Sequence, residues 1–364
     1  MKKLLAGAVL AGVLLRAAVL AGAGDAAAKW LKNVEQSGKS VTATLNIELG
    51  GGEDEPTVEP EPESAAEMAA EIATAAETTK ASLLLVAVTP PPAESDPSAE
   101  PEKSASPVPD AEVRTADLSA ASLIHNGTGL SVDAAALAAE PLKLSLQAGQ
   151  PQVLIFHTHS SEAYTPDGTD VYEASDPYRT EDKAYSVIRV GDVLAETLER
   201  SGLTVLHDRE IYDYPSYTGS YGRSGAAVEE YLKAYPSLKI VIDLHRDALG
   251  SGDVIYKTNA QVDGRTSAQA MMLIGTGENG LWHPNWRENL KLSLYLQKAV
   301  NARCPSLMRP VELVSERYNQ QLSPGMMILE VGSNGNTLRE AITAAELFGS
   351  AVGPALAALI GETE

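Results

Sequence analysis

Residues 153–166, VLIFHTHSSEAYTP, combine a strand-like apolar run with a dense cluster of polar side chains. The run VLIF is typical of a buried strand. His157 and His159 follow it directly, and Glu162 comes shortly after. Imidazole and carboxylate groups are among the ligands that zinc prefers in proteins. The stretch therefore predicts a core strand that ends in a candidate metal site.

Helices and strands alternate after this stretch. The helical spacing of Val187, Val190 and Leu194 predicts a helix that ends at Ser201-Gly202. Such alternation is typical of an α/β domain, in which a mostly parallel sheet is flanked by helices and buried on both faces. We expect a single domain over residues 113–364. Its other expected strands are 203–208, 238–248 and 325–336, and its other expected helices are 226–237, 288–305 and 337–360.

The chain before residue 113 has a different composition. Residues 1–24 begin with a basic Lys-Lys start and continue as an apolar segment that Arg16 interrupts. This pattern predicts either a signal peptide that is cleaved or a signal anchor that stays in the membrane. Both alternatives place the rest of the protein outside the cytoplasm. We expect a short membrane-proximal segment over 25–49 and a disordered acidic linker, rich in Pro, Ala and Glu, over 50–112.

Charge, cysteine content and missing motifs exclude several classes of function. The formal net charge of −21 argues against nucleic acid as a partner, because phosphate backbones bind basic surfaces. The single cysteine excludes an internal disulfide framework and a zinc site built from several cysteines. The sequence has no Walker, dinucleotide-binding or Gly-x-Ser-x-Gly motif, so NTPase, dehydrogenase and serine-hydrolase functions have no support.

Polar residues end several of the expected strands. His159 follows the first strand, and His245 and Glu330 end later ones. Parallel α/β sheets bind ligands beyond the carboxyl ends of their strands, so we expect these side chains to meet at one edge. A catalytic zinc ion takes three protein ligands and keeps one position for water, and His159, Glu162 and His245 form such a set. Glu330 is then placed to act as the general base.

The first histidine of the pair has an open role. Alternation along the strand puts His157 on the same side as His159, so His157 is either the ligand in its place or a residue that supports the ligands. The tautomer of His245 needs an acceptor behind the ring, and Asp243 and Asp247 are both candidates.

Other polar and aromatic residues near these strand ends are candidates for substrate contacts. Arg246 either pairs with Asp247 or binds a substrate carboxylate or an oxyanion. Trp286 precedes an expected helix and is either a core aromatic or a wall of the substrate site. The polar loop 332–337, which contains Asn334, follows Glu330 and is suited to positioning a polar substrate.

Motifs in the chain after residue 150 resemble those of a known family. In their order along residues 150–350 they resemble the stage II sporulation protein P family, which is related in fold to zinc-dependent N-acetylmuramoyl-L-alanine amidases. The motifs are IFHTHSSEAYTP (155–166), VIRVGDVLAETLERSGLTVLHD (187–208), YLKAYPSLKIVIDLHRDA (231–248), PNWRENLKLSLYLQ (284–297) and RYNQQLSPGMMILEVGSNGNTLREA (317–341).

The resemblance implies an enzyme that acts on peptidoglycan. It would cleave the amide between the lactyl group of the glycan and the stem peptide, with cleavage of peptide crosslinks as an additional activity. The resemblance also implies work on the septal wall during engulfment of the forespore. The implied partners are a glycan-cleaving protein similar to stage II sporulation protein D and a membrane protein that recruits both. Carried over to this chain, His159, Glu162 and His245 would bind Zn²⁺ and Glu330 would be the catalytic base.

Two other functions stay open on the residues alone. A zinc carboxypeptidase or endopeptidase acting on peptides would use the same ligands and base, and the new end groups on digested wall would distinguish it. A wall-binding scaffold without turnover would keep the fold, but the presence of all the catalytic-type residues argues against it.

Overall fold

The computed structural model describes residue 108, residues 111–116 and residues 122–361. The expected signal segment 1–24 and membrane-proximal segment 25–49 lie outside the described residues, and so does nearly all of the expected linker 50–112. Across the described residues, no helix combines the length and the apolarity that a membrane crossing requires.

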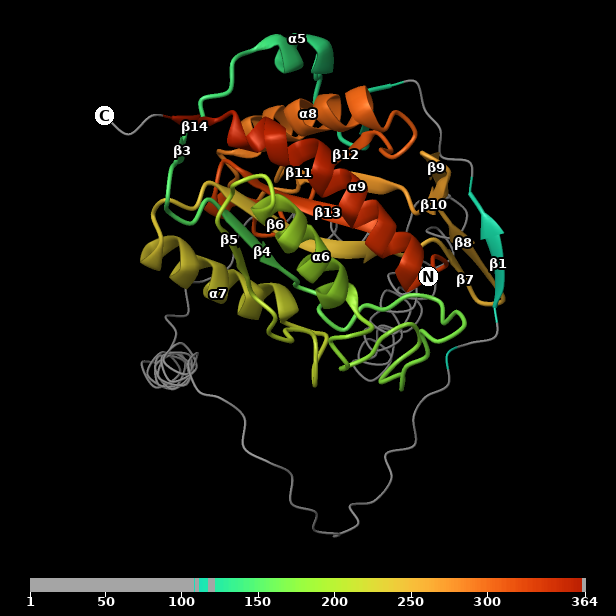
Figure 1. The fold of residues 1–364 in the computed structure, drawn as a ribbon. Coiled ribbons are helices and arrows are strands. Elements are labelled where there is room, and N and C mark those ends of the chain that lie inside the picture. Colours follow the sequence, from blue (N-terminus) through green and yellow to red (C-terminus); the bar gives the residue numbers. More distant parts are fainter. Residues whose placement is uncertain (1–107, 109–110, 117–121, 362–364) are drawn as a thin grey trace, which may run out of the picture. The chain divides into compact units, whose positions relative to one another are not determined.

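A 7-stranded sheet forms the centre of the described domain (Figure 1). Its strands, in order across the sheet, are β2 (Ile124–Asn126), β12 (Val311–Val314), β11 (Ala270–Gly275), β13 (Met326–Ser333), β6 (Ile240–Asp247), β4 (Val153–Phe156) and β5 (Val205–His207). Strands β13, β6, β4 and β5 run parallel, as do β2, β12 and β11, and the two groups meet antiparallel between β11 and β13. The prediction of a mostly parallel α/β sheet flanked by helices is confirmed.

Helices cover both faces of this sheet. Helices α6 (Val187–Glu199), α8 (Trp286–Arg303) and α9 (Leu338–Ala357) pack on one face, and α7 (Ser220–Ala234) packs on the other. Helices α6 and α9 cross the sheet side by side (Figure 1). A Cβ atom at Gly349 would lie 2.9 Å from Cγ2 of Thr197, so this close packing requires glycine at that position.

Capping residues set where the two packed helices begin. The hydroxyl of Ser186 accepts a hydrogen bond from the backbone N–H of Ile188 and caps α6. Thr337 and Glu340 form a reciprocal capping box at the start of α9. Because Thr337 comes shortly after β13, this box also fixes where the chain turns after the strand that carries Glu330.

Strands β11 and β12 were not predicted. Their runs, AMMLIG and VELV, are short apolar stretches that periodicity alone cannot assign to a strand or a helix. Smaller elements lie outside this sheet. Strand β8 (Val254–Lys257) pairs with both β1 (Glu112–Thr115) and β7 (Gly250–Ser251), β9 (Ala260–Val262) pairs with β10 (Arg265–Ser267), and β3 (Leu146–Gln147) pairs with β14 (Ile360–Gly361). The helix α5 (Ala134–Ala139) and the 3₁₀ helix η1 (Gln320–Leu322) complete the fold.

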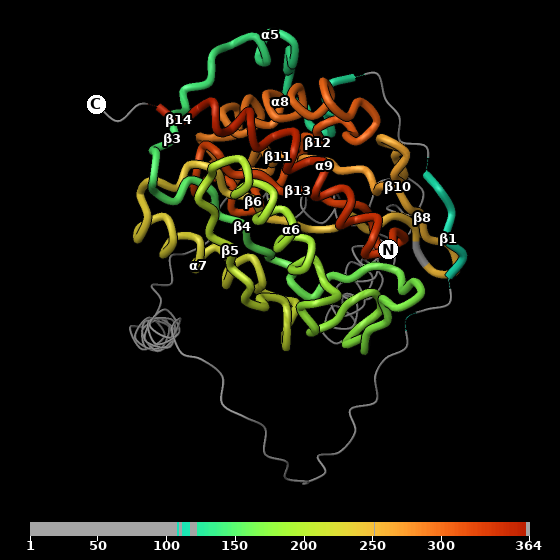
Figure 2. The backbone as a smooth tube through the Cα atoms, viewed as in Figure 1, coloured from blue at the N-terminus to red at the C-terminus, as the bar shows by residue number. Residues whose placement is uncertain are grey.

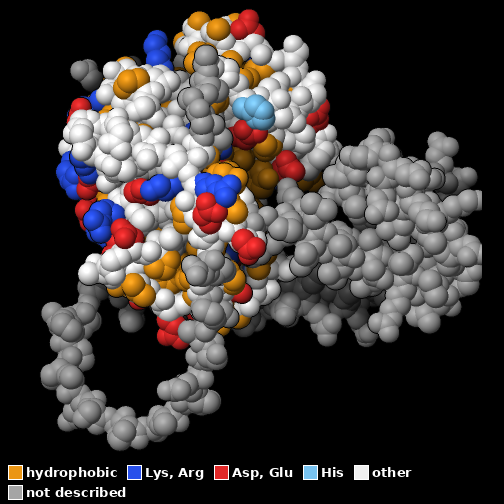
Figure 3. All heavy atoms as spheres, turned by 90° about the vertical axis from the view of Figure 1, so that its right-hand side faces the viewer, with side chains coloured by type: hydrophobic (Ala, Val, Ile, Leu, Met, Phe, Trp, Pro, Cys, Tyr) orange, Lys and Arg blue, Asp and Glu red, His pale blue; other side chains and the backbone are white. Residues whose placement is uncertain are grey.

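Surface charges of both signs are interspersed on the face shown in Figure 3. Lys and Arg side chains lie beside Asp and Glu side chains there. Exposed ion pairs on the described surface include Arg200 with Glu196 and Arg265 with Glu346. Such pairs contribute little to stability, so the fold depends on its core and on its buried polar contacts.

The register between β6 and β13 can be tested at Gly325. A Cβ atom there would lie 1.9 Å from the carbonyl oxygen of Lys239, just before β6. We expect Gly325→Ala to lower the free energy of unfolding by about 3 kcal/mol, because the backbone has to move apart. Gly222→Ala in α7 is the control, since no described atom beyond its chain neighbours and the backbone of its own helical turn lies within 4 Å of its Cβ, and it should stabilise by about 1 kcal/mol. Urea unfolding of the full chain measures both, and equal midpoints would contradict the close approach.

Candidate active site

His245 and Glu330 lie side by side because their strands are in register. Strands β6 and β13 are parallel neighbours, and His245 is paired with Glu330. Register partners in parallel strands point to the same face of the sheet. The pair Val241 and Met326 belongs to the core cluster under α7, which identifies this as the α7 face. The structure therefore brings two of the candidate residues together at the carboxyl edge.

Glu162 reaches the same place from the turn after β4. Its backbone N–H donates to the carbonyl of His159 at 3.0 Å and closes the turn. Its carboxylate Oε2 lies 3.5 Å from Nδ1 of His245 and accepts from the backbone N–H of Arg246 at 3.2 Å. Burial raises the pKa of Glu162, but Arg246 and His245 outweigh burial and hold that pKa well below its usual range.

His159 lies beside these residues, but its ring nitrogens face hydroxyl groups. Its ring is perpendicular to the ring of His245, with the centroids 5.2 Å apart. Its Nε2 lies 3.1 Å from the hydroxyl of Tyr217, and its Nδ1 lies 3.5 Å from Oγ of Ser220. Burial lowers the pKa of His159 to about 4, so the ring is neutral at pH 7, as a metal ligand has to be.

Asp243 is the carboxylate that lies behind the ring of His245. Its Oδ1 lies 2.8 Å from Nε2 of His245, at ion-pair distance but without the direction of a hydrogen bond. The same carboxylate accepts from the backbone N–H and the hydroxyl of Thr158. Burial lowers the pKa of His245, yet Asp243 and Glu162 outweigh it and raise that pKa well above its usual value. Of the two candidates for this role, Asp247 pairs instead with Arg309 at 2.7 Å.

Glu330 differs from the other carboxylates because it lacks partners. Its Oε2 is buried and has no hydrogen-bond partner among the residues that the structure describes. Burial raises the pKa of Glu330 to about 8, and the nearby charge of Asp247 adds to this, although His245 opposes it. A carboxyl that exchanges a proton near neutral pH is suited to general acid and base catalysis.

The donors suit zinc chemically, and their arrangement meets part of the requirement. A tetrahedral ion about 2.0–2.1 Å from each ligand separates its nitrogen and oxygen donors by about 3.3 Å. His245 Nδ1 and Glu162 Oε2 are close to this separation, at 3.5 Å. Within the described residues, however, no group of three or more His, Cys, Asp or Glu side chains is arranged to hold a metal ion. The ring nitrogens of His159 face Tyr217 and Ser220 instead of the space beside His245 and Glu162 that the ion would occupy.

His157 points away from His159, contrary to the expectation from strand alternation. Alternation continues beyond β4 through His157, which faces α6 as Ile155 does, and through Thr158, which contacts Ser224 of α7. The chain then turns, and His159 lies against Tyr217 and Ser220 instead of on the side of His157. His157 is fully buried, and both of its ring nitrogens have protein partners. The structure therefore does not bring His157 to the other candidate ligands, whereas it places His159 beside His245.

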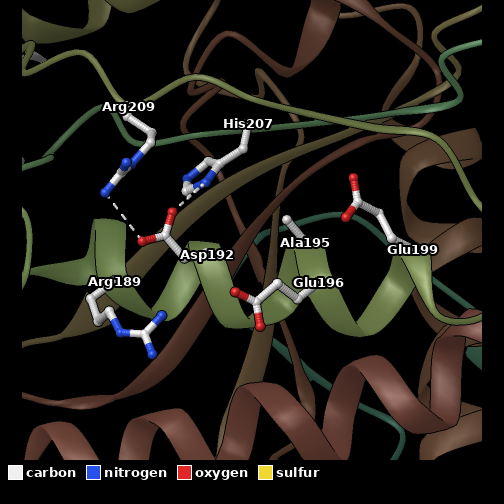
Figure 4. Close-up of a pocket in the computed structure, with 7 residues that line it drawn as sticks. All are labelled: Arg189, Asp192, Ala195, Glu196, Glu199, His207 and Arg209. Carbon is white, nitrogen blue, oxygen red and sulfur yellow. Dashed lines mark hydrogen bonds and ion pairs between the residues drawn. The ribbon is translucent and has the colours of Figure 1, made fainter. Parts of the chain in front are cut away.

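His157 belongs instead to a chain of hydrogen bonds that ends at the surface of α6. Its Nδ1 lies 2.8 Å from the carbonyl oxygen of Leu244, so this nitrogen carries the proton. Burial and the neighbouring His207 hold the pKa of His157 well below its usual value, so its Nε2 is an acceptor for Nε2 of His207 at 2.8 Å. His207 and Arg209 both contact Asp192 in the surface depression shown in Figure 4. This chain holds His157 against the strand residue that precedes His245.

Arg246 does not form an ion pair with the side chain of Asp247, which pairs with Arg309. Its guanidinium is buried and donates to the carbonyl oxygens of Ala163 and Tyr178, at 2.9 and 3.0 Å. One of its nitrogens also lies 3.6 Å from the carboxylate of Glu162. Arg246 therefore ties the segment after β4 to β6 and balances the charge of Glu162.

The two remaining candidates have different positions. Asn334 lies at the carboxyl edge of the sheet. Its backbone N–H donates to the carbonyl of Asp247, and its side-chain oxygen accepts from the backbone N–H of Leu249. Trp286 packs, partly buried, against the core at the start of α8. Because β11 runs antiparallel to β13, the chain enters α8 at the edge opposite Glu330, so the structure does not bring Trp286 to the site.

Sequence reasoning missed the residues that come from loops. Arg179 pairs with Asp213 and lies 3.4 Å from the carboxylate of Glu162. Its loop lies beside the loop that carries Asp213 and Tyr217 before α7, green and yellow-green in Figure 2. The signal for Tyr217 was present, since YPSYTGSYG is an aromatic loop after a strand at the ligand-binding edge.

The partnerless carboxyl of Glu330 predicts a pH-dependent loss of stability in the metal-free protein. Its pKa rises from an ordinary 4.5 to about 8 on folding. Between these values the folded protein holds a proton that the unfolded chain releases, so the free energy of unfolding falls as the pH rises. We expect Glu330→Gln, which cannot ionise, to lose less stability than the wild type between about pH 5 and about pH 8. Urea unfolding of chelator-treated protein measures this, and a difference that does not change with pH would contradict it.

Comparison with solved structures finds amidases of low sequence identity. Among solved structures, N-acetylmuramoyl-L-alanine amidase AmiC2 of Nostoc punctiforme is 11% identical, with 57% of this chain and 96% of that chain covered and a TM-score of 0.33. The N-acetylmuramoyl-L-alanine amidase of Clostridium difficile 630 is 13% identical, with 58% and 95% covered and a TM-score of 0.33. Similarity at this level carries no conclusion about function.

The sequence comparisons are decisive. "Stage II sporulation protein P" of Bacillus subtilis (strain 168) is 28% identical over 211 residues, which cover 54% of this chain and 50% of that protein. The chain thus spans about half the length of this curated relative. Residues 53–353 match the sequence model described as Stage II sporulation protein P (SpoIIP). The chain therefore belongs to the stage II sporulation protein P family.

Proposed function

We propose that this protein is a zinc-dependent peptidoglycan hydrolase that cleaves the N-acetylmuramoyl-L-alanine amide. Membership of the stage II sporulation protein P family supports a role in sporulation. The observation that carries the enzymatic part is the partnerless carboxyl of Glu330 beside His245, at the edge where Glu162 and His159 also lie.

The donor set supports zinc as the cofactor. His159, Glu162 and His245 would hold the ion, with Asp243 behind His245 to fix its tautomer. When bound, zinc lowers the pKa of a water ligand and polarises the scissile carbonyl. The low pKa of Glu162 and the neutral ring of His159 keep both groups in the protonation states that metal binding requires.

Glu330 has the acid and base role in this proposal. It accepts a proton from the attacking water and returns it to the leaving nitrogen of the amide. A pKa of about 8 in the metal-free site suits the return of the proton. Positive charge beside the Glu330 carboxyl lowers the pKa of that group. A lower pKa suits the first transfer, in which Glu330 accepts the proton of the attacking water.

The setting of the reaction follows from the family resemblance and the N-terminal sequence. We place the protein outside the cytoplasm, either anchored through residues 1–24 or secreted after their cleavage. Its proposed task is remodelling of the septal wall during engulfment. The proposed partners are a glycan-cleaving protein similar to stage II sporulation protein D and a membrane protein that recruits both.

Glu330→Gln tests the proposed base. We expect release of stem peptides from purified sacculi to fall by about 10²–10⁴-fold, because the proton acceptor is lost while the shape is kept. Zinc content should be unchanged, since Glu330 is outside the ligand set, whereas His245→Ala should lose the metal. Chromatography of the soluble products and elemental analysis of the purified full chain measure these effects. Retained peptide release would rule out Glu330 as the base.

The bond that is cut distinguishes the amidase from the alternatives. Amide cleavage leaves a free amino group on L-alanine and a free lactyl carboxyl on the glycan. We expect both in a mass-spectrometric analysis of digested sacculi. New amino groups within the stem peptides or crosslinks alone would identify a peptidase, and binding to sacculi without soluble product would identify a scaffold.

A further inference from the structure

Tyr217 covers His159, the ligand candidate whose nitrogens do not face the other donors. The two rings stack almost in parallel, with an angle of 13° and centroids 4.5 Å apart. Tyr217 as a whole residue is 55% exposed, while His159, stacked against it, is 8% exposed. Tyr217 therefore lies between this imidazole and solvent.

The hydroxyl of Tyr217 engages the nitrogen that a metal would need. It lies 3.1 Å from Nε2 of His159. A neutral imidazole has one acceptor nitrogen, and a tyrosine hydroxyl at neutral pH donates to it. The other nitrogen, Nδ1, then carries the proton and faces Oγ of Ser220 at 3.5 Å. While these contacts hold, His159 has no lone pair directed to Glu162 or His245.

Arg179 also contacts the ring of Tyr217. Its guanidinium carbon lies 5.0 Å from the centre of the Tyr217 ring, within the range of a cation–π contact. Arg179 is itself buried and pairs with Asp213 and with Glu162. Arg179 thus contacts both Tyr217 and Glu162, one of the proposed ligands. Through Arg179, the position of Tyr217 is linked to the charge of Glu162.

We propose that Tyr217 is the gate of the metal site. In the metal-free protein its ring and hydroxyl close His159, and its departure frees Nε2 to join Glu162 and His245. The ligand admitted is a divalent cation that accepts imidazole and carboxylate donors, as zinc does. This inference rests on the proposed zinc site and adds the residue that controls entry to it.

Chemical modification of the metal-free full chain tests the cover without any metal. Diethyl pyrocarbonate acylates free imidazole nitrogens, and mass spectrometry of the digest gives the rate at each histidine. His125, whose side chain is 71% exposed, is the internal reference. Relative to His125, we expect His159 to react about fivefold faster in Tyr217→Phe, which loses one hydrogen bond. Tyr217→Ala, which also loses the ring, should react faster still.

A matched control separates the gate from a general effect of the substitution. Tyr235, at the end of α7, is 38% exposed and lies outside the site, so Tyr235→Phe should react as the wild type does. Unchanged reactivity of His159 in both Tyr217 variants would overturn the gate, because the nitrogen would then already be accessible.

Competition titration with a chromophoric chelator tests the consequence for zinc. We expect Tyr217→Phe to bind zinc about fivefold more tightly than the wild type, because binding no longer has to break the contact at Nε2. Equal or weaker binding would overturn the gate, and weaker binding would make Tyr217 a support of the occupied site. If all variants bind zinc alike, the gate alone fails and the proposed enzyme stands. If the wild type binds none, both fail.

Discussion

The contacts of Asp243 are the constraint on which the candidate site depends. This fully buried carboxylate accepts from the backbone N–H and the hydroxyl of Thr158, at 2.8 and 2.7 Å, and lies 2.8 Å from the ring of His245. Thr158 belongs to the turn that carries His159 and Glu162, so one side chain of β6 determines where that turn lies. A buried charge is costly unless it is paired and hydrogen-bonded, and a displaced turn would leave Asp243 with neither.

The same requirement explains why the site contains two kinds of carboxylate. Glu162 and Asp243 are each held by cationic or N–H partners, which keep Glu162 ionised as a ligand must be. Glu330 is partly buried beside them with its Oε2 lacking such partners, and burial raises its pKa to about 8. Neighbouring carboxyl groups with separated pKa values can perform different tasks, here ligation and proton transfer. In the proposed enzyme this separation is a property of the protein before any metal or substrate arrives.

Much of the fold and part of the site could be predicted because the signals are local. The apolar strand 153–156, the helix that begins at Val187 and the strand ends at His245 and Glu330 all follow from periodicity and from the rule that parallel strands bind ligands at their carboxyl edge. That His157 and His159 lie on different sides could not be predicted, because the chain turns after Thr158 and the alternation that directs His157 to the α6 face does not extend to His159. Sequence alone could not choose between the two roles considered for Trp286, core aromatic or substrate wall, because no local pattern shows that β11 runs antiparallel to β13.

By itself, the sequence determined which chemical groups are available and which strands deliver them, since hydrophobic periodicity and side-chain chemistry are properties of short segments. The tertiary structure alone decided which of these groups face one another. It directed His157 to His207, Arg246 to Glu162, Asp247 to Arg309 and Tyr217 to His159. The physical reason is that each of these contacts joins segments far apart in the chain, and each exists because a buried polar group has to find a partner within the space that the packed sheet leaves.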